Sequence, residues 1–79
     1  MRLVHMEEVR PGVWIEAYLT SNGTDWTWAL RSFAYGPRRR EVPAVVAVRE
    51  LHTVHTTAQR LERERQADEL RQRERVGDE

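Results

Sequence analysis

The side chains with the widest chemical use in this chain are aromatic rings and arginines, most of them in its first half. Trp14 and Tyr18 are four positions apart, and Phe33 and Tyr35 are two apart. Even spacings place side chains on one face of a β-strand. Aromatic rings beside guanidinium groups can stack on unpaired bases, and Trp, Tyr and Arg are also enriched at protein interfaces. The spacing therefore predicts a binding surface on a sheet.

Arginine supplies every basic side chain, and four arginines fall close to these aromatics. We treat the following eight residues as candidate binding residues: Trp14, Tyr18, Arg31, Phe33, Tyr35, Arg38, Arg39 and Arg40. The alternative is that the aromatics are ordinary core, because an aromatic stripe more often packs than binds. In that interpretation, Arg38 to Arg40 form a solvated loop beside Glu41.

The other reactive residue types form no catalytic pattern. His52 and His55 are three apart, so they share a face only on a helix, and no carboxylate in the same segment has a matching ligand spacing. Ser21 and Ser32 lack a glycine-flanked elbow, and the glycines are too scattered to cradle a phosphate. Cysteine is absent. We therefore predict no enzyme activity, no metal site and no cofactor.

Length and composition narrow the class of protein. The 79 residues suffice for one domain, and the 13 basic and 13 acidic residues cancel, so no overall charge attracts nucleic acid or a membrane. The absence of cysteine suits a reducing compartment, and no stretch is apolar enough for a signal peptide or a membrane span. We expect a cytoplasmic protein. The use of arginine without lysine is typical of a GC-rich genome.

The composition changes near position 56. Residues 1–55 contain all aromatics and prolines and most β-branched residues, whereas 56–79 are mainly Arg, Glu, Gln, Asp, Ala and Leu. The first part reads as an antiparallel sheet and the second as a charged helix with a frayed tail, within a single domain.

A hairpin centred on Asn22-Gly23 is the best local signal, because this dipeptide favours a two-residue type I′ turn between two alternating runs. The turn predicts apolar pairs on one face: Leu19 with Trp26, Ala17 with Trp28, and Ile15 with Leu30. The other face then pairs Tyr18 with Thr27, Glu16 with Ala29, and Trp14 with Arg31.

Further strands are expected on both sides of this hairpin. Residues 3–6 read as a short edge strand, and Arg10-Pro11-Gly12 as the turn that follows it. Gly36-Pro37 should end the second long strand, and residues 42–48 alternate in the manner of another strand.

The charged segment has two candidate starting points as a helix. Thr56 and Gln59 form a capping-box pattern that favours a start near Thr57, and the helix would then end at about Arg75. The alternative start is near Arg49, because apolar residues recur at helical spacing from Leu51 onward. The thin apolar stripe of the helix makes self-association through it a hypothesis, with Ala58, Leu61, Ala67 and Leu70 as the contact residues.

The sequence thus predicts an α+β protein with a small, twisted antiparallel sheet of about three to five strands and one charged C-terminal helix. A half-open barrel is the alternative form of the sheet. The predicted function is non-enzymatic binding of another protein by a small accessory protein, such as one encoded by a phage or mobile element. Two alternatives stay open: a module that binds single-stranded nucleic acid, and a structural component of a larger assembly such as a virion.

Overall fold

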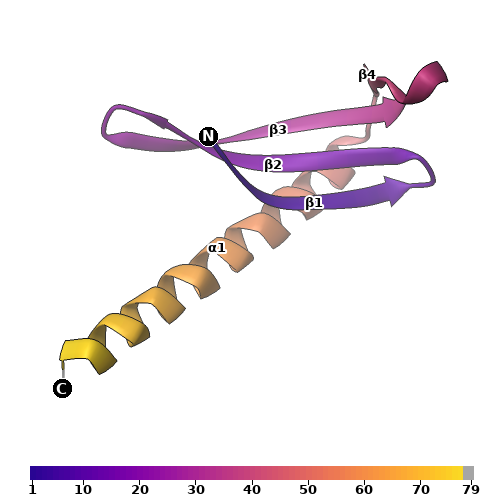
Figure 1. Ribbon diagram of the computed structural model, residues 1–79. Helices are drawn as coiled ribbons and strands as arrows, with labels where there is room; N and C mark the ends of the chain where they lie inside the picture. Colours follow the sequence, from indigo (N-terminus) through magenta and orange to yellow (C-terminus); the bar gives the residue numbers. More distant parts are fainter. Residues whose placement is uncertain (78–79) are drawn as a thin grey trace.

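The computed structural model describes residues 1–77 and contains one antiparallel sheet followed by one long helix (Figure 1). The strands lie in chain order across the sheet, which stays open and does not close into a barrel. The predicted α+β architecture is confirmed. The elements are β1 (Arg2–Arg10), β2 (Val13–Asn22), β3 (Asp25–Tyr35), a 3-10 turn (Pro37–Arg39), β4 (Glu41–Pro43) and α1 (Val48–Gly77).

The central hairpin forms, but with a different turn and register from those predicted. Asn22 pairs with Asp25, so the two turn residues are Gly23 and Thr24. Every pair is displaced by two residues: Leu19 faces Trp28 rather than Trp26, and Trp14 faces Phe33 rather than Arg31. The predicted register is therefore wrong, although each residue keeps the face that was assigned to it.

Glycine geometry explains the displaced turn. Gly23 has a φ of +74°, whereas Thr24 is not among the described non-glycine residues with positive φ. Glycine at the first of two turn positions fits a type II′ turn, while the predicted type I′ turn would need positive φ at both. Because the side chains of a strand alternate with a period of two, a displacement by two residues moves no side chain to the other face.

β1 extends the predicted edge strand at residues 3–6 to Arg2–Arg10. Its pairing with β2 shifts between Leu3 and His5 and again between Glu8 and Arg10, which marks two bulges. The predicted turn after β1 is confirmed at Pro11 and Gly12.

The segment after β3 departs most from the prediction. Of the predicted strand over 42–48, only Val42 and Pro43 belong to a strand, which is β4 (Glu41–Pro43), and the helix begins at Val48 rather than Thr57. The early helix start, treated above as the alternative, is the one observed. Glu50 accounts for it, because its carboxylate accepts a hydrogen bond from the N–H of Ala47 (2.8 Å) and so caps the first turn.

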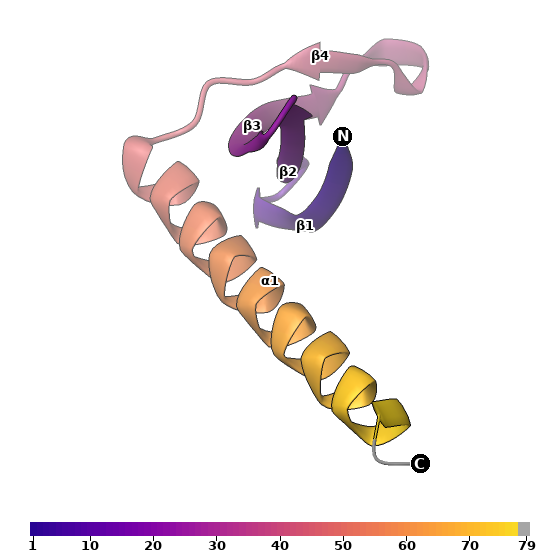
Figure 2. The same cartoon turned by 90° about the vertical axis from the view of Figure 1, so that its left-hand side faces the viewer.

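The core lies between α1 and one face of the sheet. Ile15 and Ala17 of β2 pack against Val54 and Ala58 of α1, and all four are fully buried. The small alanine side chains let helix and strand approach closely. The later turns of α1 run away from the sheet into solvent (Figures 1 and 2). The frayed tail predicted for the end of the chain includes Asp78 and Glu79, which lie outside the described residues.

Candidate functional site

The sheet face that points away from α1, called the open face below, gathers the predicted aromatic residues. Ile15 and Ala17 point toward the helix, so Trp14, Glu16 and Tyr18 point away from it by strand alternation. Their partners on the neighbouring strands point the same way. These neighbours include Leu3, Met6, Glu8, Ala29, Arg31, Phe33, Tyr35 and Glu41.

An ion-pair network centred on Arg31 holds the middle of the open face. The Arg31 guanidinium donates to the carboxylate of Glu16 (2.8 Å) on β2 and to that of Glu41 (2.5 Å) on β4. The hydroxyl of Tyr18 donates to the second oxygen of Glu16 (2.7 Å). Glu16 is only 8% exposed, so the bonds from Arg31 and Tyr18 supply the partners that its buried charge requires.

The network raises the pKa of two of its members, Tyr18 and Arg31. The hydrogen bond to the Glu16 carboxylate raises the pKa of Tyr18, since the neutral phenol is the form that donates. Hydrogen bonds to Glu41 and Glu16 raise the pKa of Arg31. Tyr18 therefore stays neutral and Arg31 stays charged at neutral pH, so both keep their hydrogen bonds in the network.

Aromatic rings continue the open face toward β4. The Arg31 guanidinium lies 4.7 Å from the centre of the Phe33 ring, and Phe33 meets Tyr35 edge to face with ring centres 5.6 Å apart. Phe33 is only 3% exposed because these neighbours cover it, whereas Tyr35 is 56% exposed. At the other side of the face, Leu3 and Met6 of β1 are each nearly half exposed.

The structure separates Arg38, Arg39 and Arg40 from this network. They occupy the turn between β3 and β4, and Arg38 and Arg39 adopt the left-handed backbone region. All three are exposed, and among residues 1–77 none of their side chains makes a hydrogen bond or an ion pair. Of the eight predicted binding residues, the first five thus share one face and the last three form a basic turn at its end.

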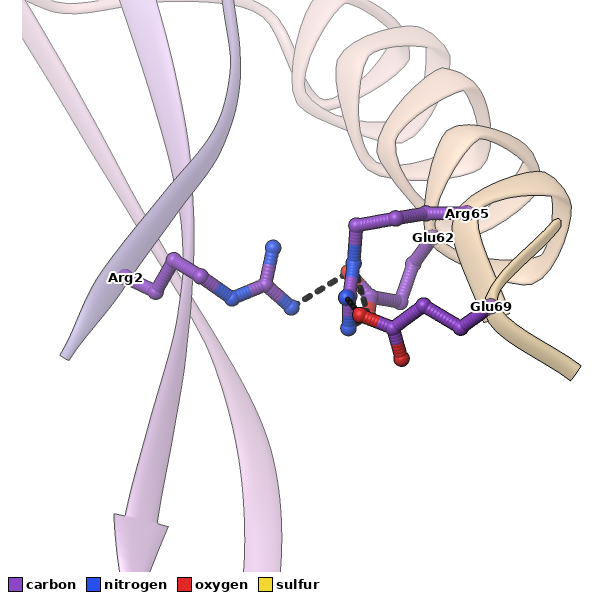
Figure 3. A network of polar contacts seen from close by, with 4 residues as sticks. All are labelled: Arg2, Glu62, Arg65 and Glu69. Carbon is purple, nitrogen blue, oxygen red and sulfur yellow. Dashed lines mark hydrogen bonds and ion pairs between the residues drawn. The ribbon is translucent and has the colours of Figure 1, made fainter. Parts of the chain in front are cut away.

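A concave surface lies on the other side of the sheet, where α1 leaves it. This cleft has a volume of about 570 Å³, and its sheet side includes Leu19, Trp26 and Trp28. On the helix side, the Glu62 carboxylate forms ion pairs with Arg2 of β1 (2.5 Å) and with Arg65 (2.6 Å). Arg65 also forms an ion pair with Glu69 (Figure 3).

Glu62 lines this cleft and joins the helix to the sheet through Arg2. It is 6% exposed, and the hydrogen bond from Arg65, with help from Arg2, lowers its pKa despite its burial. The same bond raises the pKa of Arg65. This contact could not be predicted from the sequence, because Glu62 stands in a run of alternating charges that gives no sign of which glutamate faces the sheet.

The residues proposed for helix self-association divide into two groups. Ala58 is fully buried and Leu61 partly buried on the side of α1 that covers its own sheet, whereas Ala67 and Leu70 are exposed farther along. His52 is exposed, and His55 packs edge to face on Trp28 (5.5 Å between ring centres). Within residues 1–77, no group of His, Cys, Asp and Glu side chains is arranged to hold a metal ion.

Comparison of the chain with protein-family models, curated proteins and solved structures gives no match. In the part of the chain that the structure describes, no helix has both the length and the apolar character needed to cross a membrane. The function is therefore inferred from the two faces of the sheet and from the charges that they carry.

Proposed function

We propose that the protein is a non-enzymatic accessory protein whose open face binds another protein. The observation that carries this proposal is the composition of that face. Exposed apolar side chains of Leu3, Met6 and Tyr35 lie around a fixed centre formed by Arg31 and Phe33, and no element within residues 1–77 packs over them. An exposed apolar patch with a polar centre is typical of protein interaction sites.

The charges of the open face favour a protein over a nucleic acid. Glu8, Glu16 and Glu41 lie on it, whereas Arg31 is the one cation that residues 1–77 place there, and it already bonds to two of these carboxylates. A phosphate chain would meet this acidic surface and would have to compete for Arg31. A partner that offers apolar side chains and a basic group near Glu8 fits the same surface without breaking its ion pairs.

The rigidity of the open face also supports binding. Arg31 is tied to two strands on either side of β3, and Phe33 is held between Arg31 and Tyr35. Side chains that are already ordered lose little entropy on association, so the area that they bury contributes more of its free energy to affinity.

The basic turn of Arg38, Arg39 and Arg40 is the observation that favours the nucleic-acid alternative. Three exposed arginines beside Tyr35 could hold phosphates while the ring stacks on a base. Neutralising about three phosphates gives weak binding that falls steeply with salt concentration. The protein partner requires no such salt dependence, because apolar burial is not screened by ions.

Site-specific photo-crosslinking tests the proposal. A photoreactive phenylalanine replaces Tyr35 on the open face or, as the control, Thr53 on the exposed side of α1. In a nuclease-treated lysate of the source cells, we expect a discrete protein adduct from position 35 and none from position 53. A second change, Met6→Arg, should reduce this adduct, because it places a cation in the apolar patch.

Two outcomes would contradict the proposal. The first is an adduct that disappears after nuclease treatment, together with salt-sensitive binding of a single-stranded oligonucleotide that is lost when Arg38, Arg39 and Arg40 are changed to Gln. The second is equal crosslinking from positions 35 and 53, which would show that the open face makes no specific contact.

A further inference from the structure

Within residues 1–77, the sheet has two long edges without a partner strand. One is the outer edge of β1, and the other is the outer edge of β3 over residues 25–31. β4 pairs only with Phe33–Tyr35, and one more hydrogen bond joins the N–H of Ala44 to the carbonyl of Ser32 (3.2 Å). Among residues 1–77, no strand pairs with β3 beyond that point.

The direction of the free backbone groups follows from that single bond. The Ser32 carbonyl points away from β2, and β2 and β3 pair without a register shift from Asn22–Asp25 to Val13–Ala34. Backbone groups alternate along a strand, so the N–H and C=O groups of Trp26, Trp28 and Leu30 also point outward. They form a row of donors and acceptors at the edge of the sheet.

The two edges differ in how they are protected against pairing. β1 contains two bulges and the charged residues Arg2, Glu7, Glu8 and Arg10, and both features hinder the addition of another strand. The segment 26–30 of β3 reads WTWAL and has no charge, proline or bulge. An unprotected apolar edge of this kind is a template for strand addition.

We propose that a second copy of this chain adds to the β3 edge in antiparallel orientation, about a two-fold axis at Thr27. In this register Trp26 of each copy lies opposite Trp28 of the other, which gives two identical aromatic pairs. Asp25 lies diagonal to Arg31 of the second copy, within reach of an ion pair. The interface is thus self-complementary, as a two-fold axis requires.

The position of α1 leaves room for this arrangement. The helix packs most closely beneath β1 and β2, so the row of Trp26 and Trp28 lies at the border of the core. Trp26 is 62% exposed. Trp26 and Trp28 of a second copy would cover these rings. The apolar layer beneath the sheet would then continue from the helix of one copy to that of the other.

Steric fit favours an axis at Thr27 over an axis one residue along, at Trp28. Ala44 lies beside Ser32 on the outer side of β3, where an added strand would run. With the axis at Trp28, Ser32 of the second copy would lie opposite the turn residue Thr24, so the backbones of Ala44 and Thr24 would collide. With the axis at Thr27, Ala44 of the second copy lies two residues beyond, past the end of the hairpin. The hairpin tip and the β4 segment then fit end to end.

A single engineered cysteine tests the axis directly, since the chain has no native thiol. In the full chain, Thr27→Cys places two thiols opposite each other across the axis, at a spacing suited to a disulfide. The control is Thr20→Cys, on the neighbouring strand and the same face. Under mild oxidation, we expect a covalent dimer from position 27 and about tenfold less from position 20.

Charge repulsion provides the second test, with the mass in solution measured by light scattering. The wild-type chain should be a dimer. Thr27→Lys should weaken it by about tenfold or more, because two ammonium groups would face each other across the axis. Thr20→Lys is the matched control, since it removes the same Thr20–Thr27 hydroxyl contact (3.0 Å) without placing charges at the axis. A monomeric wild-type chain, or equal crosslinking from positions 20 and 27, would overturn the proposal.

Discussion

The two faces of the sheet are built from the same strands, but their side chains are buried in different ways. On the helix-covered face, small and branched side chains such as Ile15 and Ala17 are buried by a second layer, α1. On the open face no second layer exists within residues 1–77, and Glu16 and Phe33 are buried by the long side chains beside them.

This difference shows that burial alone does not identify a core. Phe33 is nearly as inaccessible as Ile15, yet its cover consists of two neighbouring side chains, Arg31 and Tyr35, rather than a packed helix. Loss of a side-chain contact should therefore reduce the unfolding free energy strongly on the covered face and less on the open face. The exception is a loss that leaves a buried charge without its partner. The following predictions test that rule, from the largest expected effect to the smallest.

The covered face should be the most sensitive to truncation. Ile15→Ala removes a fully buried side chain and leaves a cavity that the helix cannot close, so we expect a loss of about 2 to 5 kcal/mol of unfolding free energy. Leu3→Ala on the open face should cost less than about 1 kcal/mol, because Leu3 is 44% exposed. Urea denaturation followed by circular dichroism measures both. Equal losses would contradict the distinction between the faces.

On the open face, the large effect should come from an unpaired charge. Arg31→Met leaves Glu16 buried without its cation, and we expect a loss of about 1 to 3 kcal/mol. A second change, Glu16→Gln, should recover most of that loss in the same chain. Glu41→Gln is the control, since Glu41 is exposed and its removal should cost less than about 0.5 kcal/mol. Additive losses from Arg31→Met and Glu16→Gln would show that the pair is not coupled.

The contact between helix and sheet at Glu62 should depend on pH. Its folded pKa lies below the ordinary value of 4.5, so the unfolded chain takes up the proton first as the solution is acidified. The stabilisation is therefore complete above about pH 4.5 and is lost as the pH falls through the folded pKa of Glu62.

Two variants make that pH dependence measurable. Unfolding free energies from neutral pH down to acid should decline less steeply in Glu62→Gln than in the wild type. Glu64→Gln, a change at an exposed glutamate of the same helix, should leave the wild-type slope unchanged. Identical slopes for the wild type and Glu62→Gln would show that the ion pair with Arg2 and Arg65 does not stabilise the fold.

The smallest effect is expected where α1 has left the sheet. Leu70→Gln should change the unfolding free energy by less than about 0.5 kcal/mol, because Leu70 is exposed and distant from the core. The mass in solution separates two modes of association. A dimer through the β3 edge should persist in this variant, whereas self-association through Ala67 and Leu70 would be weakened by it.

Local patterns predicted the elements better than their boundaries. The alternation around Asn22-Gly23 correctly assigned the faces of β2 and β3, because a face depends only on parity. It gave the wrong partners, since the predicted type I′ turn needs positive φ at both Asn22 and Gly23, and only Gly23 adopts it. The helix start was misplaced because Glu50 outcompeted the Thr56 pattern as a cap.

The candidate site was predictable only in part, because parity assigns a face to each residue but not a partner. Parity placed Trp14, Tyr18 and Phe33 together, but it could not show that Glu16 lies between Tyr18 and Arg31 and completes the network. The corrected register brings Arg31 opposite Glu16, and that pairing requires the observed turn.

The sequence by itself determined the class of fold, the division of the strands into two faces, and the charged character of the helix, because each follows from periodicity or composition along a short segment. Only the tertiary structure decided which face the helix covers, and therefore which aromatics are core and which border an open surface. Both faces of this sheet carry large apolar side chains, so local patterns do not distinguish them. The choice is made by contacts distant in sequence: Val54 and Ala58 fit against Ile15 and Ala17, and Glu62 binds Arg2.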